Sequence, residues 1–172
     1  MGRGWQRGRK RSSARLVAGQ GRAQRLASST GAGWLGSGDP AFEKALTILA
    51  GHYPQHCQVK IGFDEGLAHR IEAGADLFLM PSRYEPCGLN QIYSLRYGTL
   101  PVVRRTGGLA DTVTDWSEGL ARATGFVFDA ATPPALLEVV LRALQHYRDD
   151  PVGWRRVVGN AMARDYSWRR SA

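Results

Sequence analysis

Residues 75–91 have the sequence Ala-Asp-Leu-Phe-Leu-Met-Pro-Ser-Arg-Tyr-Glu-Pro-Cys-Gly-Leu-Asn-Gln. The apolar run at residues 75–80 is typical of a buried parallel strand, and Pro81 ends it because proline cannot donate to a strand ladder. From Leu89 onward the apolar spacing becomes helical, until Gly98 supplies a common helix stop. The stretch therefore predicts a strand, a loop and a helix in succession.

The loop between this strand and this helix places a carboxylate beside a glycine. Gly88 and Leu89 stand at the expected helix start, where free backbone N–H groups and the positive end of the helix dipole suit a diphosphate. Glu85 would face the cleft outside the carboxyl ends of the strands, where open α/β sheets bind ligands. On these residues alone, a ligand site and an ordinary structural loop both remain open.

Similar elements alternate along the rest of the chain. Asp39 and Pro40 form an N-cap and first-turn pair, and Asp64 can cap the following helix. Helices are expected at residues 40–52, 64–74, 89–98, 133–147 and 152–163, strands at 59–63, 75–80, 100–103 and 126–128, and a loop at 104–111. Strands separated by helices predict an α/β, Rossmann-like fold, with a parallel sheet and helices on both faces.

The net charge is confined to the N-terminal segment. The formal net charge is +8, and residues 1–33 hold eight basic residues and no acidic one, so residues 34–172 are neutral. Two cysteines, Cys57 and Cys87, do not make a disulfide framework, and no apolar run approaches the ~18 residues of a membrane span. We therefore expect a cytoplasmic protein with one domain, and neither a membrane nor nucleic acid as its partner.

Two other patterns are interpreted as carrying no site. Residues 31–36, Gly-Ala-Gly-Trp-Leu-Gly, match the dinucleotide fingerprint, but that motif needs a buried strand before it and a helix opening at its last glycine. The preceding residues 25–30 do not have the composition of a strand. His52, His56 and Cys57 are close in sequence, but they lie at a polar helix end without a fourth ligand, so we expect no metal site.

A series of short motifs runs through most of the chain in a fixed order. These motifs are Gly62-Phe63-Asp64-Glu65, Ala68-His69-Arg70-Ile71, Gly74-Ala75-Asp76, residues 81–89, Tyr97-Gly98-Thr99, residues 106–113, Gly125-Phe126-Val127-Phe128 and Tyr166-Ser167-Trp168. In type and order they resemble the bacterial glycogen synthase and plant starch synthase family, whose members are retaining glucosyltransferases that use ADP-glucose. The resemblance covers roughly residues 35–172, and it is specific because so many motifs recur in one order.

The resemblance implies the C-terminal domain of the two-domain glycosyltransferase architecture named GT-B. In that family the nucleotide sugar lies between the domains, mostly on the C-terminal one, and the acceptor glucan lies on the other. The implied activity is the transfer of glucose from ADP-glucose to the non-reducing end of an α-1,4-glucan such as glycogen, with retention and without a cofactor. Residues 34–172 would be the nucleotide-sugar-binding domain, with the N-terminal domain missing and the final helix truncated.

The chain alone is therefore expected to be an inactive fragment. Two alternatives stay open: a nucleotide-sugar-binding module that acts only with a separate N-terminal domain chain, and a basic-tailed interaction protein. Residues 1–33 are Arg-, Gly-, Ser- and Ala-rich, and we expect them to be disordered. They could be a nucleic-acid-binding arm, a transit peptide or a solvated tail. We favour translation out of register or a truncated gene end, because the family places an apolar strand directly before residues 35–40.

The resemblance also implies roles for single residues. Glu85 matches the family's essential glutamate beside the glucosyl ring, where its charge would stabilise an oxocarbenium-like transition state; the alternative is a helix-start carboxylate. Phe63 aligns with the tyrosine on which the family stacks adenine, and core packing is its alternative. Gly88 and Leu89 would present backbone N–H groups to the donor. Cys87 would line the donor pocket, or else be a small buried apolar residue.

The loop after the expected strand at residues 100–103 completes the site. Thr106, Gly107 and Gly108 would border the donor phosphates, although a turn that needs two glycines is equally consistent with this sequence. The preceding Arg104 and Arg105 could neutralise a phosphate. We expect one of these two arginines to pair instead with one of the nearby carboxylates, Asp111 or Asp115.

Overall fold

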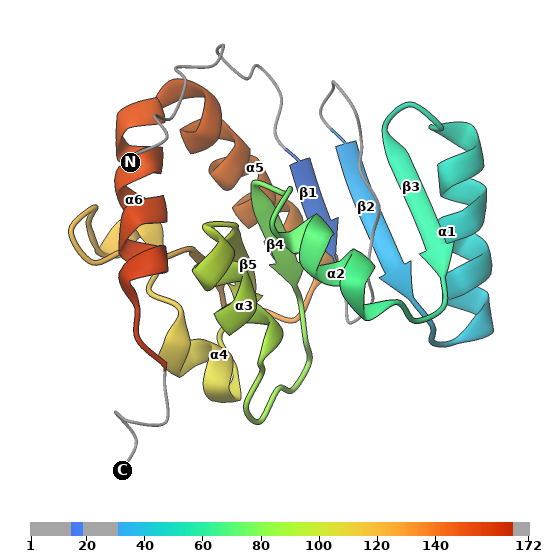
Figure 1. Ribbon diagram of the computed structural model, residues 1–172, viewed down its shortest axis with the longest axis horizontal. Helices are drawn as coiled ribbons and strands as arrows, with labels where there is room; N and C mark the ends of the chain where they lie inside the picture. Colours follow the sequence, from blue (N-terminus) through green and yellow to red (C-terminus); the bar gives the residue numbers. More distant parts are fainter. Residues whose placement is uncertain (1–14, 19–30, 167–172) are drawn as a thin grey trace, which may run out of the picture.

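The computed structural model describes residues 15–18 and 31–166, and within them one parallel sheet has the strand order β3-β2-β1-β4-β5-β6 (Figure 1). Helices and strands alternate along the chain. The strands are β1 (Arg15–Ala18), β2 (Gly31–Gly36), β3 (Cys57–Ile61), β4 (Leu77–Met80), β5 (Leu100–Arg104) and β6 (Phe126–Phe128). The helices are α1 (Pro40–His52), α2 (Glu65–Glu72), α3 (Asn90–Tyr97), α4 (Gly107–Thr112), α5 (Pro133–Asp149) and α6 (Pro151–Ala163), with a 3-10 turn, η1, at Trp116–Glu118. The predicted Rossmann-like α/β fold is confirmed.

The order of the strands reverses at β1. The chain runs outward from β1 through β2 to β3, and then returns to β4 on the other side of β1 before it continues to β5 and β6. In doubly wound sheets the crevice at such a switch point, outside the carboxyl ends of the strands, is where ligands bind. The topology thus singles out the edge formed by the ends of β1 and β4.

Successive strand residues enter two separate apolar clusters, one on each face of the sheet. On β4, Leu77 belongs to the cluster that contains Val139 of α5 and Val157 of α6. Its neighbour Phe78 belongs to the cluster that contains Leu67 of α2. Because side chains alternate across a strand, the two clusters occupy opposite faces. Helices therefore cover both faces of this part of the sheet, as the sequence predicted.

The helix boundaries follow local signals that the sequence carries. Asp39 accepts a hydrogen bond from the Ala41 N–H at 2.7 Å, and Asp64 accepts one from the Leu67 N–H at 2.9 Å. Each side chain satisfies a backbone donor that the first helical turn leaves unpaired. At the other end of α3, Gly98 takes a left-handed conformation with φ of 76° and ends the helix.

The structure differs from the sequence-based expectations at three elements. Strands β1 and β2 lie wholly or partly within residues 1–33, so the expected disorder is wrong at residues 15–18 and 31–33, while residues 1–14 and 19–30 lie outside the described part of the chain. Both strands have paired neighbours on each side, and this pairing overrides the weak strand propensity of a glycine-rich sequence. The third element is α4, which forms where a loop was expected.

Helix α1 packs more loosely than the other long helices. None of its residues is buried, and Phe42 is 71% exposed. It packs beside β3 at the edge of the sheet (Figure 1). Among the helices that the structure describes, none is long and apolar enough to cross a membrane.

Candidate functional site

Every residue that the sequence predicted for the site lies just beyond the carboxyl end of a strand. Phe63 follows β3, the loop at residues 81–89 follows β4, and Thr106 follows β5. The loop after β4 and helix α4 lie side by side below the sheet in Figure 1. Because parallel strands end at one edge, the three segments lie along the same carboxyl edge of the sheet, on which the switch point lies.

The β4–α3 loop and the start of α4 touch through their backbones. The Gly108 N–H donates to the Glu85 carbonyl at 3.1 Å and to the Pro86 carbonyl at 3.3 Å. A Cβ atom on Gly107 would collide with the Glu85 carbonyl, and one on Gly108 would collide with the Cys87 carbonyl. Both glycines are therefore required by this close approach, which gives the structural interpretation of the pair a physical basis. Their contact with phosphate stays a prediction.

The start of α3 has the backbone geometry of an anion-binding helix N-terminus, with no side chain capping it. Gly88 has φ of 63°, a left-handed conformation that glycine adopts without strain. Leu89 is the N-cap, and no side chain caps the helix there. The N–H groups of the first turn therefore have no capping side chain, and the positive end of the helix dipole coincides with them. Leu89 itself is exposed.

Gln91 organises this junction, a role that the sequence analysis did not predict. Its side chain is fully buried, and its Nε2 donates to the Gly88 carbonyl at 2.8 Å, to the Thr112 hydroxyl at 3.2 Å and to the Cys87 carbonyl at 3.3 Å. Thr112 in turn donates to the Gly108 carbonyl at 2.6 Å. One amide thus joins the β4–α3 loop to α4. A polar residue at a helical position gives no indication of such tertiary bonds, so only the structure could reveal it.

The remaining predicted site residues are placed near the ligand edge with their side chains accessible. Phe63 is 84% exposed, so the alternative of core packing is wrong. Cys87 is also exposed, so it is not a buried apolar residue, and Glu85 is half-buried. Strands β3 and β4 are three strand spacings apart, about 14 Å. A ligand that reaches both Phe63 and Glu85 must therefore be extended.

The two arginines after β5 are tied to the loops rather than to the expected carboxylates. Arg104 donates through Nε to the Ser82 carbonyl at 2.9 Å, and also to the Arg83 carbonyl, so it supports the base of the β4–α3 loop. Arg105 pairs with Asp129 at 2.8 Å. The expected pairing of an arginine with Asp111 or Asp115 is wrong, because the Asp115 carboxylate is occupied by an arginine from α5.

The buried carboxylate of Asp115, at the start of η1, forms an ion pair with Arg142 of α5. Both of its oxygens accept from Arg142, at 2.9 and 2.8 Å, and one also accepts from the Val127 N–H at 2.6 Å. Burial raises the pKa of Asp115, but the hydrogen bonds from Arg142, Ser117 and Val127 outweigh burial and lower the pKa to about 2. Asp115 is therefore a structural anion that links η1, β6 and α5.

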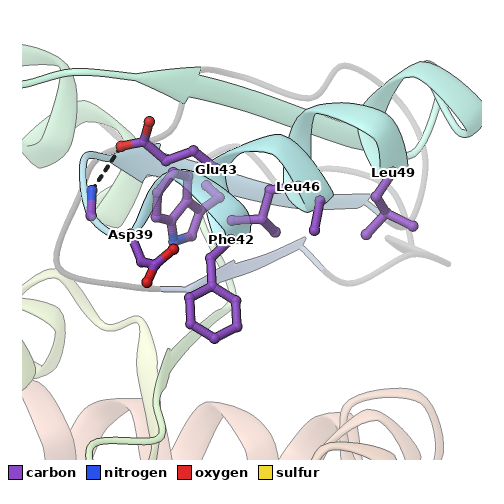
Figure 2. Close-up of a pocket in the computed structure, with 8 residues that line it drawn as sticks. Asp39, Phe42, Glu43, Leu46 and Leu49 are labelled. Carbon is purple, nitrogen blue, oxygen red and sulfur yellow. Dashed lines mark hydrogen bonds between the residues drawn. The ribbon is translucent and has the colours of Figure 1, made fainter.

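A cavity of about 570 Å³ lies elsewhere, against α1 (Figure 2). Trp34, Phe42, Leu46 and Leu49 give it an apolar wall, and at one end Glu43 accepts a hydrogen bond from the Gly38 N–H at 2.7 Å. None of the predicted site residues lines it. In the described residues, no group of three or more His, Cys, Asp or Glu side chains is placed to hold a metal ion.

The sheet order and the loops at its switch point define an α/β protein of the doubly wound class, with an edge suited to a nucleotide. Sequence comparison narrows this class. The model of the family described as "Glycosyl transferases group 1" matches residues 36–152, and the chain belongs to that family.

Individual relatives agree with the resemblance seen in the sequence. Glycogen synthase of Anaeromyxobacter dehalogenans (strain 2CP-C) is 64% identical over 138 residues, which are 80% of this chain and 29% of that protein. Glycogen synthase of Thioalkalivibrio sulfidiphilus (strain HL-EbGR7) is 57% identical over 141 residues, with 80% and 29% covered. The chain thus spans less than a third of the length of these relatives, and the predicted resemblance to the glycogen and starch synthases is confirmed.

Solved structures place the fold among glycosyltransferases. The catalytic domain of Starch Synthase IV from Arabidopsis thaliana, bound to ADP and acarbose, matches with a TM-score of 0.82 and 28% identity over 96% of this chain and 37% of that chain. Sucrose-phosphate synthase from Thermosynechococcus elongatus matches with a TM-score of 0.63 and 23% identity, over 89% of this chain and 40% of that chain, and shares the fold. The predicted GT-B domain fold is confirmed.

Proposed function

We propose that residues 34–172 are the nucleotide-sugar-binding domain of a glycogen synthase. That enzyme transfers glucose from ADP-glucose to the non-reducing end of an α-1,4-glucan, with retention, in the cytoplasm. The observation that carries the proposal is the convergence of the Glu85 loop, the uncapped start of α3 and the glycine pair of α4 at the switch-point edge. High identity to glycogen synthases and the likeness to a starch synthase bound to ADP support it.

Each site residue has a role in this proposal. The exposed ring of Phe63 stacks on adenine, and the N–H groups of Gly88 and Leu89 bind the diphosphate, which Thr106, Gly107 and Gly108 border. Glu85 lies beside the glucosyl ring, where its charge stabilises an oxocarbenium-like transition state. Cys87, with its exposed thiol, lines the donor pocket. The separation of about 14 Å between the ends of β3 and β4 suits an extended ligand whose base and sugar lie at opposite ends.

The acceptor glucan is assigned to a second domain, so the chain alone binds the donor and transfers no glucose. Both sites of a transfer reaction must be present for turnover, because proximity of the two substrates supplies much of the rate. Incubation of the purified chain with labelled ADP-glucose and glycogen tests this. We expect no label in the glucan, and appreciable incorporation would show that the chain carries a complete active site.

Donor binding is tested by titrating the purified chain with ADP in a calorimeter. Phe63→Ala is expected to weaken ADP binding about tenfold, since stacking of a base on an aromatic ring contributes about 1–3 kcal/mol. Tyr53→Ala is the matched control, because it removes another exposed aromatic ring, one that lies between the end of α1 and the start of β3 and therefore at the opposite end of that strand. Glu85→Ala should leave ADP affinity unchanged, as its proposed contact is with glucose. Equal affinity in the wild type and Phe63→Ala would remove the adenine-stacking role.

A further inference from the structure

The amide of Gln91 is held in one orientation by its acceptors. Its Nε2 lies within 3.3 Å of two carbonyl oxygens, those of Cys87 and Gly88, and of the Thr112 hydroxyl. Carbonyl oxygens only accept hydrogen bonds, so the nitrogen must face them. The Thr112 hydroxyl uses its proton on the Gly108 carbonyl and is therefore also an acceptor toward Gln91. Each of these hydrogen bonds therefore has one possible donor, and the orientation of the Gln91 amide is determined.

The other end of the amide has no partner among the described residues. Gln91 Oε1 is buried and makes no hydrogen bond there. It lies against Gly88, where any Cβ atom would collide with it. A buried amide oxygen without a donor is unfavourable. An apolar side chain at this position would avoid that cost, so any favourable contribution of the glutamine must come from the bonds of its nitrogen.

The nitrogen connects the two segments that form the ligand edge. Cys87 and Gly88 end the loop that carries Glu85 and lead into the uncapped start of α3. Thr112 is the last residue of α4, whose first turn contacts that same loop through the Gly108 N–H. The network thus closes a ring from the loop through Gln91 and Thr112 to Gly108 and back to Glu85.

We propose that Gln91 is a positioning residue that fixes the Cys87–Gly88 turn against α4, so that the start of α3 is set to receive a nucleoside diphosphate. This inference rests on the proposed function. Gln91 itself does not touch the ligand, because its side chain is fully buried. It acts by restricting the backbone before any ligand arrives, which lowers the ordering cost of binding.

Gln91→Met is the variant to test, because it keeps the length of the side chain and replaces the amide, with its donor and its unpaired oxygen, by an apolar thioether. Thr112→Val removes the hydroxyl that bonds to Gln91 and to the Gly108 carbonyl. It is the variant to use if Gln91→Met does not fold. Leu95→Val is the matched control, because it takes a methylene from a fully buried residue of the same helix and leaves the network intact. Two measurements are made on the whole chain: amide hydrogen exchange at Gly108, and ADP affinity by calorimetry.

We expect exchange of the Gly108 N–H to rise at least tenfold in Gln91→Met and ADP affinity to fall about tenfold, with both quantities nearly unchanged in Leu95→Val. Thr112→Val should shift both in the same direction by a smaller factor. Unchanged Gly108 exchange in Gln91→Met would overturn the positioning role. Faster exchange with unchanged ADP affinity would also overturn it, because the network would then hold the loop without serving the ligand.

The two proposals fail in different ways. If the wild-type chain does not bind ADP, the proposed function fails, and with it the purpose assigned to Gln91, whatever the exchange rates show. If the wild type binds ADP and Phe63→Ala weakens that binding while Gln91→Met does not, the function stands and the inference about Gln91 alone is wrong.

Discussion

The two ends of the sheet are stabilised in different ways. At the β6 end, α5 and α6 cover an apolar cluster that includes Phe126 and Val157, which are fully buried. At the β3 end, α1 buries no residue, and Phe42 is mostly exposed. Yet α1 and α5 both begin with a capping side chain followed by proline. The cap and the proline predict that a helix forms, and they do not predict how much of it is buried.

This difference in burial indicates that the β6 end of the sheet contributes more to the stability of the fold than the β3 end. Burial of apolar surface is the main favourable contribution to folding, and α1 takes little part in it. A helix of about 13 residues is marginal by itself in water, so α1 depends on its cap and on its attachment to β2 and β3. We therefore expect the β3 end to open locally at a lower free energy than the β6 end.

The largest effect is expected when a phenylalanine is removed from each end. Phe126→Ala should lower the free energy of unfolding by about 3–5 kcal/mol, because removal of the buried ring leaves a cavity. In the wild type this ring stacks on Trp116, with 5.4 Å between the ring centroids. Phe42→Ala should change the free energy of unfolding by less than about 0.5 kcal/mol, as is usual for an exposed side chain. Urea titration of the two variants measures both values. Equal losses would show that the α1 end is as firmly packed as the β6 end.

Two aspartates extend the comparison to polar groups. Asp115→Asn should cost roughly 2 to 3 kcal/mol at pH 7, because the carboxylate is more acidic in the folded protein than in an unfolded chain. Since its folded pKa of about 2 is lowered, this stabilisation is present above about pH 4 and is lost as the pH falls toward 2. Asp39→Asn should be nearly neutral, because asparagine caps a helix as well as aspartate does.

Denaturant titrations at pH 7 and at pH 3 measure this dependence. The difference between wild type and Asp115→Asn should shrink at the lower pH. A difference that stays constant between the two pH values would show that the charge of Asp115 is not what stabilises the β6 end.

A smaller effect is expected at the junction between the β4–α3 loop and α4. Gly108→Ala should cost about 2 kcal/mol, since its Cβ would displace the Cys87 carbonyl. Gly159→Ala in α6 is the control, because no atom lies near the added methyl. It should stabilise the protein by about 0.5–1 kcal/mol, the usual gain of alanine over glycine in a helix. Thermal unfolding of both variants gives the signs, and a stabilising Gly108→Ala would contradict the close approach.

The smallest effect is expected at the cap of α1. Asp39→Ala removes the acceptor for the Ala41 N–H and should cost about 1 kcal/mol. Hydrogen exchange should become faster throughout α1 and stay unchanged in α5. Faster exchange in both helices would mean that the two ends of the sheet unfold together.

Much of the fold could be predicted because its signals are local. Asp39, Asp64 and Gly98 marked helix ends correctly, and the apolar run at residues 75–80 marked β4. Strand β2 was missed because a glycine-rich sequence has weak strand propensity. Its strand conformation depends on hydrogen bonding to both neighbouring strands, β1 and β3. Helix α4 was missed because a glycine pair predicts a turn rather than a helix.

In the candidate site, too, features with a local sequence signal were predicted and features that depend on tertiary contacts were not. The sequence motif around Glu85 pointed to the loop, and the exposure of Phe63 agrees with a surface role that sequence could not distinguish from core packing. The bonds of Gln91 join segments about twenty residues apart, so no periodicity of the chain reports them. The partner of Asp115 was predicted wrongly, because proximity in sequence favoured Arg104 or Arg105 over an arginine on α5.

The backbone contact between the β4–α3 loop and α4 has a consequence for protein engineering. A loop that is shaped only by its own sequence can be exchanged between relatives without its neighbours. Here the carbonyl groups of Glu85 and Cys87 fit against a surface made by Gly107 and Gly108, so the loop is one half of a matched pair. Chimeras that exchange residues 81–89 alone would break this fit, and a successful exchange must carry residues 106–112 with them as a single cassette.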